Sequence, residues 1–237
     1  YSGPVDAAGI SVVPLGGRYV NHFWRLLNDL DIPHITLLDL DRERDGGGWG
    51  RIKYALQQLI DNGYSPKELL KITSGALSKA ELDKMHTWDV HDTKTMQGWI
   101  DSLEQYNIFF STPLDLDFLM LESYVDEYKS ILAGQEGPYI KGKGKIIDFG
   151  DAELDSDEYK ARVECDIRNT LKDCGGDGGT YTDEQHDLMV WYTYFFLSRG
   201  KPSTHIQAIS NMDDIDIVFS MPQVIFKIIK AAAKILG

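Results

Sequence analysis

A segment of apolar residues, HITLLDLD at residues 34–41, ends in two aspartates and continues into RERDGGGWG. Its run of isoleucine and leucines is typical of a buried strand, which needs other strands beside it and helices over its faces. Because side chains alternate along a strand, we expect Asp39 and Asp41 to point to the same side and Leu40 to face the core. The segment therefore predicts an α/β fold with charged groups at one end of its sheet.

The neighbouring segments extend this pattern. Residues 10–17, ISVVPLGG, predict a buried strand that feeds a glycine turn, and residues 19–33 place apolar side chains at helical spacing. A strand, a helix and a second strand in this order predict a parallel pair joined by a right-handed crossover. Further on, NIFF at residues 107–110 predicts a third strand, and STPLDLD forms its exit.

Most of the remaining sequence predicts helix. Residues 73–105 show no alternation and indicate a helical insertion, while CGGDGGT at residues 174–180 indicates a flexible connection. We predict further helices at residues 51–63, 65–72, 118–132, 155–172, 182–198, 198–209 and 221–236. The organisation that follows is an α/β domain at residues 1–150 with the insertion near residues 51–104, and a helical carboxyl-terminal segment at residues 151–237.

Composition limits the classes of function. The chain has 237 residues, of which 43% are hydrophobic, and can bury a sizeable core. Its longest apolar runs fall short of the roughly 20 residues of a membrane-spanning helix, so we expect a cytoplasmic protein without a membrane partner. Cys165 and Cys174 lack the spacing of a metal site, and we interpret them as free thiols. The net charge of −13 disfavours non-specific binding to polyanions, so any nucleic-acid function must rest on local features.

Four aspartates follow predicted strands: Asp39, Asp41, Asp115 and Asp117. Ligands of open α/β sheets bind beyond these strand ends, and each D-L-D would direct two carboxylates to one point. Crowded carboxylates destabilise a fold unless a cation lies between them, and oxygen ligands favour Mg²⁺ or Mn²⁺ over zinc. The alternative is that these side chains are solvated loop residues or helix N-caps, which suits Asp115 or Asp117 in particular.

Several of these segments together resemble the carboxyl-terminal region of the OLD (overcoming lysogenization defect) family of nucleases. The resemblance rests on GISVVPLGG, IPHITLLDLDRER, FFSTPLDLDFLML, SRGKPSTHIQAI and MPQVIFKIIK, in the same order, and most specifically on LLDLD and KPSTH. Members of this family carry an ATPase domain followed by a Toprim domain, the metal-binding α/β module also found in topoisomerases and primases. The resemblance implies a Toprim-type domain with a mostly parallel sheet flanked by helices.

The resemblance also implies roles for particular residues. Asp39 and Asp41 match the metal-binding D-x-D, and Asp39 is also an expected catalytic residue. Asp115 and Asp117 fall where the family has a second pair of metal ligands, the second usually a glutamate. Lys201 matches a lysine that reaches the active site, where it would offer a positive charge to the scissile phosphate. Without the resemblance, Lys201 would be a solvated lysine in a turn.

From the resemblance we expect a Mg²⁺- or Mn²⁺-dependent DNA endonuclease that uses two metal ions and acts in phage defence or DNA repair. Its expected partners are DNA, the ATPase domain of the same protein, where ATP would bind, and further copies of the protein through that domain. The family's opening glutamate motif is expected upstream of this chain, so the chain alone should cut DNA poorly. The alternative is a non-catalytic Toprim-like interaction or effector module.

Basic and polar residues suggest contacts with DNA. Arg42 and Arg44 follow the D-x-D and would either pair with the acidic residues or contact the DNA backbone. Lys141 and Lys143 belong to KGKGK, the only concentrated basic stretch. Ser203 is expected to cap a short helix whose N-terminus would bind a phosphate.

Two other side chains have weaker claims to a functional role. We expect His205 to have a buried structural role, because it would share a helix face with Lys201 only if the helix began earlier than predicted. Trp49 would either stack on a base or, as we prefer, anchor the next helix in the core.

Overall fold

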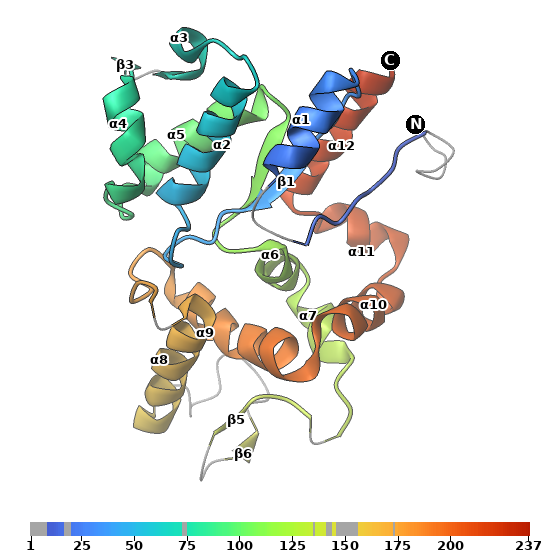
Figure 1. Ribbon diagram of the computed structural model, residues 1–237. Helices are drawn as coiled ribbons and strands as arrows, with labels where there is room; N and C mark the ends of the chain where they lie inside the picture. Colours follow the sequence, from blue (N-terminus) through green and yellow to red (C-terminus); the bar gives the residue numbers. More distant parts are fainter. Residues whose placement is uncertain are drawn as a thin grey trace.

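The computed structural model describes residues 9–16, 20–72, 75–134, 136–140, 144–145, 156–172 and 174–237. The described residues form a mixed α/β structure that is mostly helical (Figure 1). At its centre, strand β1 (Thr36–Asp39) pairs in parallel with β4 (Ile108–Ser111). The described strands outside this pair form two short antiparallel ladders: β2 (Lys71–Ile72) with β3 (Gly75–Ala76), and β5 (Tyr139–Ile140) with β6 (Gly144–Lys145).

Helices make up most of the described chain. In chain order they are α1 (Asn21–Asp29), α2 (Trp49–Asp61), α3 (Pro66–Leu69), α4 (Lys79–Lys84), the 3₁₀-helix η2 (Met85–Thr87), α5 (Thr93–Glu104), α6 (Leu116–Ser123), α7 (Val125–Ser130), α8 (Asp157–Leu171), α9 (Asp183–Tyr192), the π-helix η4 (Thr193–Arg199), α10 (Lys201–Asn211), α11 (Asp214–Phe219) and α12 (Gln223–Leu236).

One apolar core surrounds the parallel strands. Its buried side chains come from α1, α2, α5 and β4, among other elements, and they include Ile52, Trp99 and Phe110. The indole of Trp24 donates a hydrogen bond of 2.9 Å to the hydroxyl of Thr36, which ties α1 to β1. This core fixes the strands, and so it fixes the edge where both of them end.

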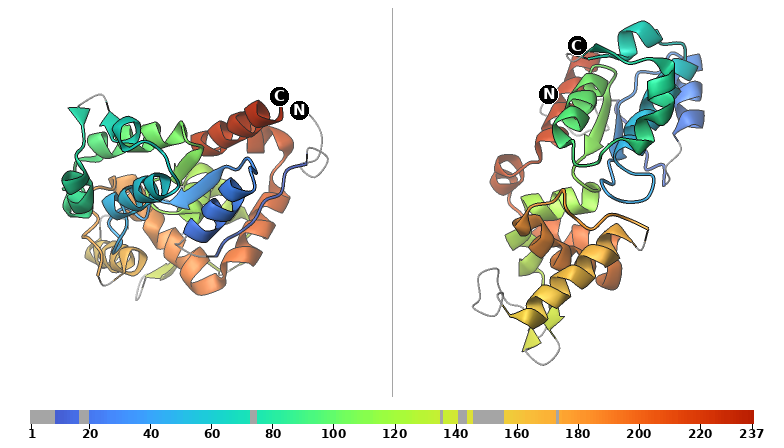
Figure 2. Two further views of the ribbon diagram at one scale, coloured as in Figure 1. Left: turned by 45° about the horizontal axis from the view of Figure 1, so that its top comes forward. Right: turned by 90° about the vertical axis from the view of Figure 1, so that its left-hand side faces the viewer.

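A second apolar core lies beyond that edge, among α6, α7, α8, α9, η4 and α10. Its largest fully buried side chains include Phe118, Tyr128, Tyr192 and Phe195. Figure 2 shows the two parts of the molecule in its right-hand view, with the strands and α5 above and α8 to α10 below. The strand ends therefore lie between two packed bodies. The predicted domain division at residue 150 stays a prediction.

Most predicted elements are confirmed, but two are wrong in whole or in part. The helix predicted at residues 65–72 ends at Leu69, and residues 71–72 form strand β2. The strand predicted at residues 10–17 is wrong for the residues described there. Residues 9–16 form no strand, and the side chain of Val12 is 81% exposed. Pro14 cannot donate to a strand ladder, and the short apolar run has no partner beside it. β1 is instead paired with β4, and the segment between them carries α2 to α5.

Two simpler predictions can also be compared with the structure. Cys165 and Cys174 are free and exposed, as expected. Among the described residues, the helices are all too short or too polar to cross a membrane.

Candidate functional site

The carboxyl ends of β1 and β4 lie at one edge because the strands are parallel. The chain leaves β1 through a tight turn in which Asp41 (φ 53°) and Glu43 (φ 65°) both adopt left-handed backbone conformations. Such a conformation costs roughly 1–2 kcal/mol at a residue other than glycine, so other contacts must hold the turn. One is the 2.7 Å hydrogen bond from the amide of Asp41 to the carbonyl of Leu114, in the exit of β4.

Asp39 is the last residue of β1, and its side chain remains open to solvent on one side. Its Oδ1 accepts hydrogen bonds from the hydroxyl of Ser111 (3.0 Å) and the amide of Leu116 (3.2 Å). Burial of the rest of the carboxyl and the charge of Asp115 raise its pKa. Among the described residues, no hydrogen bond reaches Oδ2, so Asp39 retains a free carboxylate oxygen.

Asp41 is 5% exposed, and both of its oxygens face arginines. Oδ1 accepts from Arg44 Nη1 at 2.7 Å, and Oδ2 accepts from Arg51 Nη2. Burial would raise the pKa of Asp41, but the hydrogen bonds from Arg51 and Arg44 outweigh it and lower the pKa. Asp41 is therefore a buried carboxylate that is already neutralised by two cations.

Asp115 is the N-cap of α6, so one of its alternative roles is confirmed. Its Oδ1 accepts from the amide of Phe118 at 2.9 Å, and its Oδ2 accepts from Tyr192 (2.7 Å) and Arg44 Nη1 (3.0 Å). The same guanidinium donates to the carbonyl of Thr170 (2.9 Å) and to the hydroxyl of Tyr192 (3.0 Å). Arg44 thus pairs with the acidic residues and joins the strand exit to α8 and α9.

The second D-L-D does not direct two carboxylates to one point. Extended backbone ends at Asp115, and α6 begins at the next residue, so Asp117 lies in the first helical turn. For the same reason Leu116 is 38% exposed and does not face the core, whereas Leu40 is 1% exposed as predicted. The local capping bond decides the geometry here, and spacing alone does not reveal it.

Asp117 binds two side chains of α10. Its Oδ2 accepts from the ammonium of Lys201, and its Oδ1 accepts from His205 Nε2 at 2.9 Å. The other imidazole nitrogen lies 2.5 Å from the hydroxyl of Tyr128. Burial would raise the pKa of Asp117, but the hydrogen bonds from His205 and Lys201 lower it below its ordinary value.

The start of α10 corrects the predictions for His205 and Ser203. The π-helix η4 ends at Arg199 and α10 begins at Lys201, so Gly200 alone separates them. Gly200 has a φ of 117°, a backbone conformation that residues other than glycine rarely adopt. Lys201 and His205 are therefore four residues apart on one helix face and share Asp117. Ser203 lies inside the first turn, where its hydroxyl donates to the carbonyl of Gly200 at 3.3 Å, and it does not cap the helix.

Arg42 makes no ion pair with the aspartates among the described residues, and its expected contact with the DNA backbone stays a prediction. Its Nη2 donates to the carbonyl of Thr180 at 2.6 Å, and its guanidinium lies 4.9 Å from the centre of the Tyr181 ring. The hydroxyl of Tyr181 donates in turn to the carbonyl of Arg42 at 2.6 Å. Burial lowers the pKa of Arg42.

Glu43 was not predicted to have a role, yet it holds the glycine-rich segment. Its Oε2 accepts from the amide of Gly178 (2.7 Å), and its Oε1 accepts from the amide (2.7 Å) and hydroxyl (2.5 Å) of Thr180. A Cβ at Gly175 would overlap the backbone carbonyl of Glu43, so glycine is required there. The segment at residues 174–180 is thus bound to the strand exit, whereas the sequence indicated a flexible connection.

The described carboxylates do not fit a two-metal centre as they lie. No three acidic, histidine or cysteine side chains in the described part of the chain are arranged to hold a metal ion. Both oxygens of Asp41, Asp115 and Asp117 already accept hydrogen bonds. Arg44 and Arg51 supply the positive charge that crowded carboxylates need, so the assignment of the four aspartates as metal ligands stays a prediction.

The remaining candidates are quickly placed. Trp49 is 3% exposed, packs edge-on against Trp88 and donates to the carbonyl of Asp89 at 2.9 Å, so its role as a hydrophobic anchor is confirmed. Lys141 and Lys143 lie outside the described residues.

Comparison with known proteins bears on the first strand and its exit. Residues 1–41 match the family model for the overcoming lysogenization defect protein-like TOPRIM domain, and the match includes Asp39 and Asp41. A search of curated proteins and a search of solved structures found no match. Toprim domains bind divalent metals, so the match suggests a nuclease-type or metal-binding function. The match agrees with the resemblance over residues 1–41, where the chain is similar to the OLD-like Toprim domain.

Proposed function

We propose that this chain forms part of the DNA-cleaving site of an OLD-type nuclease. The observation that carries the proposal is that three distant segments meet at one strand edge. Asp39 and Asp41 come from the Toprim-matched segment, Asp117 comes from the exit of β4, and Lys201 comes from α10. The carboxylate of Asp39 is exposed and could hold a metal ion, and the exposed ammonium of Lys201 could attract a phosphate.

Lys201 is the cation that we assign to the DNA phosphate. Its side chain is 46% exposed, whereas those of Arg44 and Arg51 are 9% and 13% exposed and lie against carboxylates. An ammonium group is a compact positive charge. On one side Asp117 would hold the ammonium of Lys201, and on the other side the ammonium would attract a phosphate oxygen. Because the chain carries a net charge of −13, this local attraction must overcome a repulsive background.

The proposal includes a rearrangement of the arginines. In the described structure Arg44 and Arg51 occupy the oxygens of Asp41, and a divalent cation would compete with them for that carboxylate. Asp39 alone among the four aspartates keeps an oxygen that no described residue occupies. We therefore place the first contact of any metal ion at Asp39.

Plasmid nicking by the full-length protein with Mg²⁺ tests the proposal. We expect Asp39→Ala and Lys201→Ala each to reduce nicking by about 100-fold or more, the usual effect of removing a group that stabilises the reaction's charge. Glu164→Gln, on the exposed face of α8, is the matched control and should cut as the wild type does. Circular dichroism checks that each variant is folded. Undiminished nicking by folded Asp39→Ala would sink the proposal.

A second candidate function is a non-catalytic interaction or effector module. The arginine-neutralised state of Asp41 and Asp115 favours it, because these carboxylates are stable without any metal ion. This candidate predicts that the full-length wild-type protein neither nicks plasmid with Mg²⁺ or Mn²⁺ nor binds either ion through Asp39 and Asp41.

A further inference from the structure

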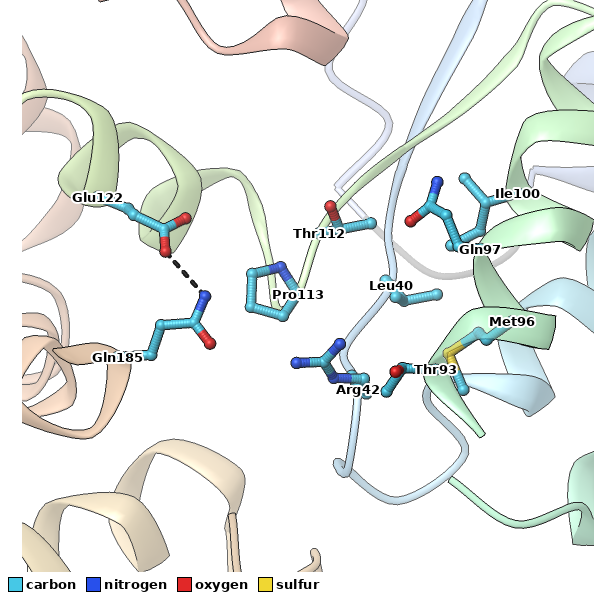
Figure 3. A pocket seen from close by; sticks show the side chains of 10 residues that line it. All are labelled: Leu40, Arg42, Thr93, Met96, Gln97, Ile100, Thr112, Pro113, Glu122 and Gln185. Carbon is cyan, nitrogen blue, oxygen red and sulfur yellow. Dashed lines mark hydrogen bonds between the residues drawn. The ribbon is translucent and has the colours of Figure 1, made fainter. Parts of the chain in front are cut away.

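A cavity of about 260 Å³ lies beside the strand exits, where Leu40 and Arg42 follow β1 and Thr112 and Pro113 follow β4 (Figure 3). It is bounded by α5, by the exit of β4, and by α6 and α9. Its polar lining includes Arg42, Gln97, Glu122 and Gln185, and Leu40 and Pro113 also line it. The reaction proposed above uses none of these side chains.

The charged groups of the cavity retain capacity for a ligand. The Nη2 of Arg42 donates to the carbonyl of Thr180, and its Nε is buried without a partner among the described residues, so the donors that remain for a ligand are on its terminal nitrogens. Glu122 accepts from the amide of Gln185 through Oε1 at 2.8 Å, and no described hydrogen bond reaches its Oε2. Figure 3 shows the Glu122 and Gln185 pair on one side, Gln97 on the other, and Pro113 and Arg42 between them. The cavity thus offers a donor from the guanidinium of Arg42 and an acceptor from the exposed carboxylate of Glu122, with no described hydrogen bond between the two.

We propose that this cavity binds an unpaired guanine base. Guanine presents two acceptors, O6 and N7, which suit a guanidinium, and two neighbouring donors, N1–H and the N2 amino group, which suit a carboxylate. Arg42 and Glu122 supply one partner for each of these edges, and the amides of Gln97 and Gln185 lie beside them. Adenine has an amino group in place of O6, so it would set a donor against the guanidinium.

The size of the cavity suits one planar base. Clefts for drug-sized ligands hold about 300–1,000 Å³, so about 260 Å³ suits a single base better than a larger ligand. Asp41 lies between the lining residues Leu40 and Arg42 in the chain. A DNA strand whose base entered the cavity would therefore pass its backbone close to the strand ends that carry Asp39 and Asp41.

The inference rests on DNA as the substrate class of the proposed function, but it can be tested without cleavage. Fluorescence anisotropy with the full-length protein in EDTA would measure binding to duplexes that carry one unpaired G, A, C or T at the same position. We expect the unpaired G to bind at least about tenfold more tightly than the other three, the usual size of one good base contact. Glu122→Gln should reduce this preference to about twofold or less, and Glu164→Gln should retain it.

Competition separates a base in a strand from a free nucleotide. Displacement of the labelled G duplex by GMP but not AMP would support the guanine pocket and show that it accepts the free nucleotide. Displacement by unlabelled G duplex alone would support it as a contact to DNA. Equal binding of all four duplexes by the wild type, or full guanine preference in Glu122→Gln, would overturn the inference. Guanine preference without any nicking would contradict the proposed nuclease function only.

Discussion

Removal of the Glu43 carboxylate should release the glycine-rich segment from the strand exit and destabilise the whole chain. Glu43 is 8% exposed, and its carboxylate accepts from the amides of Gly178 and Thr180, each at 2.7 Å. Glu43→Ala would leave both amides without a partner, at about 1–3 kcal/mol each, while the Thr180 hydroxyl can turn to another acceptor. We therefore expect the free energy of unfolding to fall by about 2–6 kcal/mol.

Glu43→Gln refines this prediction because it keeps the size of the side chain. The amide oxygen can still accept one hydrogen bond, but the amino group would face an N–H donor, so we expect a loss of about 1–3 kcal/mol. Urea unfolding at pH 7 gives the free energies, and amide hydrogen exchange at Gly178 and Thr180 reports on the segment itself. Glu164→Gln should stay within about 0.5 kcal/mol of the wild type. The reasoning is refuted if the free energy of unfolding of Glu43→Ala also stays within about 0.5 kcal/mol of the wild type. It is refuted as well if both amides exchange at the wild-type rate in that variant.

Three further predictions concern the strand edge. Lys201→Met should change the free energy of unfolding by less than about 1 kcal/mol, because the lysine is 46% exposed. The same variant should reduce nicking by about 100-fold. A large loss of stability in urea would contradict this prediction. The lowered pKa of Asp117 stabilises the fold fully above its ordinary value of 3.8, and this contribution is lost as pH falls through the lowered pKa. Asp117→Asn should therefore flatten the pH dependence of stability below pH about 4, and an unchanged slope in urea titrations would count against the ion pair. Arg51→Gln leaves Asp41 with one arginine, so the variant should bind Mn²⁺ about tenfold more tightly than the wild type in calorimetry. An unchanged affinity would show that Arg51 does not compete with the metal ion.

The fold was predictable where its signals are local. Apolar runs predicted β1 and β4, and helical spacing with capping residues predicted most of the helices. The strand predicted at residues 10–17 failed because a buried strand needs a partner, and no described strand pairs with residues 10–16. The prediction that Asp115 and Asp117 point to the same place failed for another reason. In sequence, an aspartate that ends a strand looks like one that caps a helix, and Asp115 does both.

The site was less predictable because its contacts join distant segments. Pairing of Arg44 with the acidic residues was one of two alternatives, but the roles of Arg51 and Glu43 depend on helix and loop packing that spacing does not reveal. One missed signal was present: Pro202 is typical of a first helical turn, and it would have started α10 at Lys201 and placed His205 on the same face. The glycines at residues 175–179 were a second signal, since glycine also permits close backbone approach to a carboxylate.

Calorimetric titration of the full-length protein with Mn²⁺, without nucleotide, most directly tests whether the strand edge is a nuclease site. We expect wild-type protein to bind Mn²⁺ through Asp39 and Asp41, and the double variant Asp39→Ala, Asp41→Ala to lose that binding. The same absence of binding in both proteins, or equal affinity in both, would contradict the proposed site.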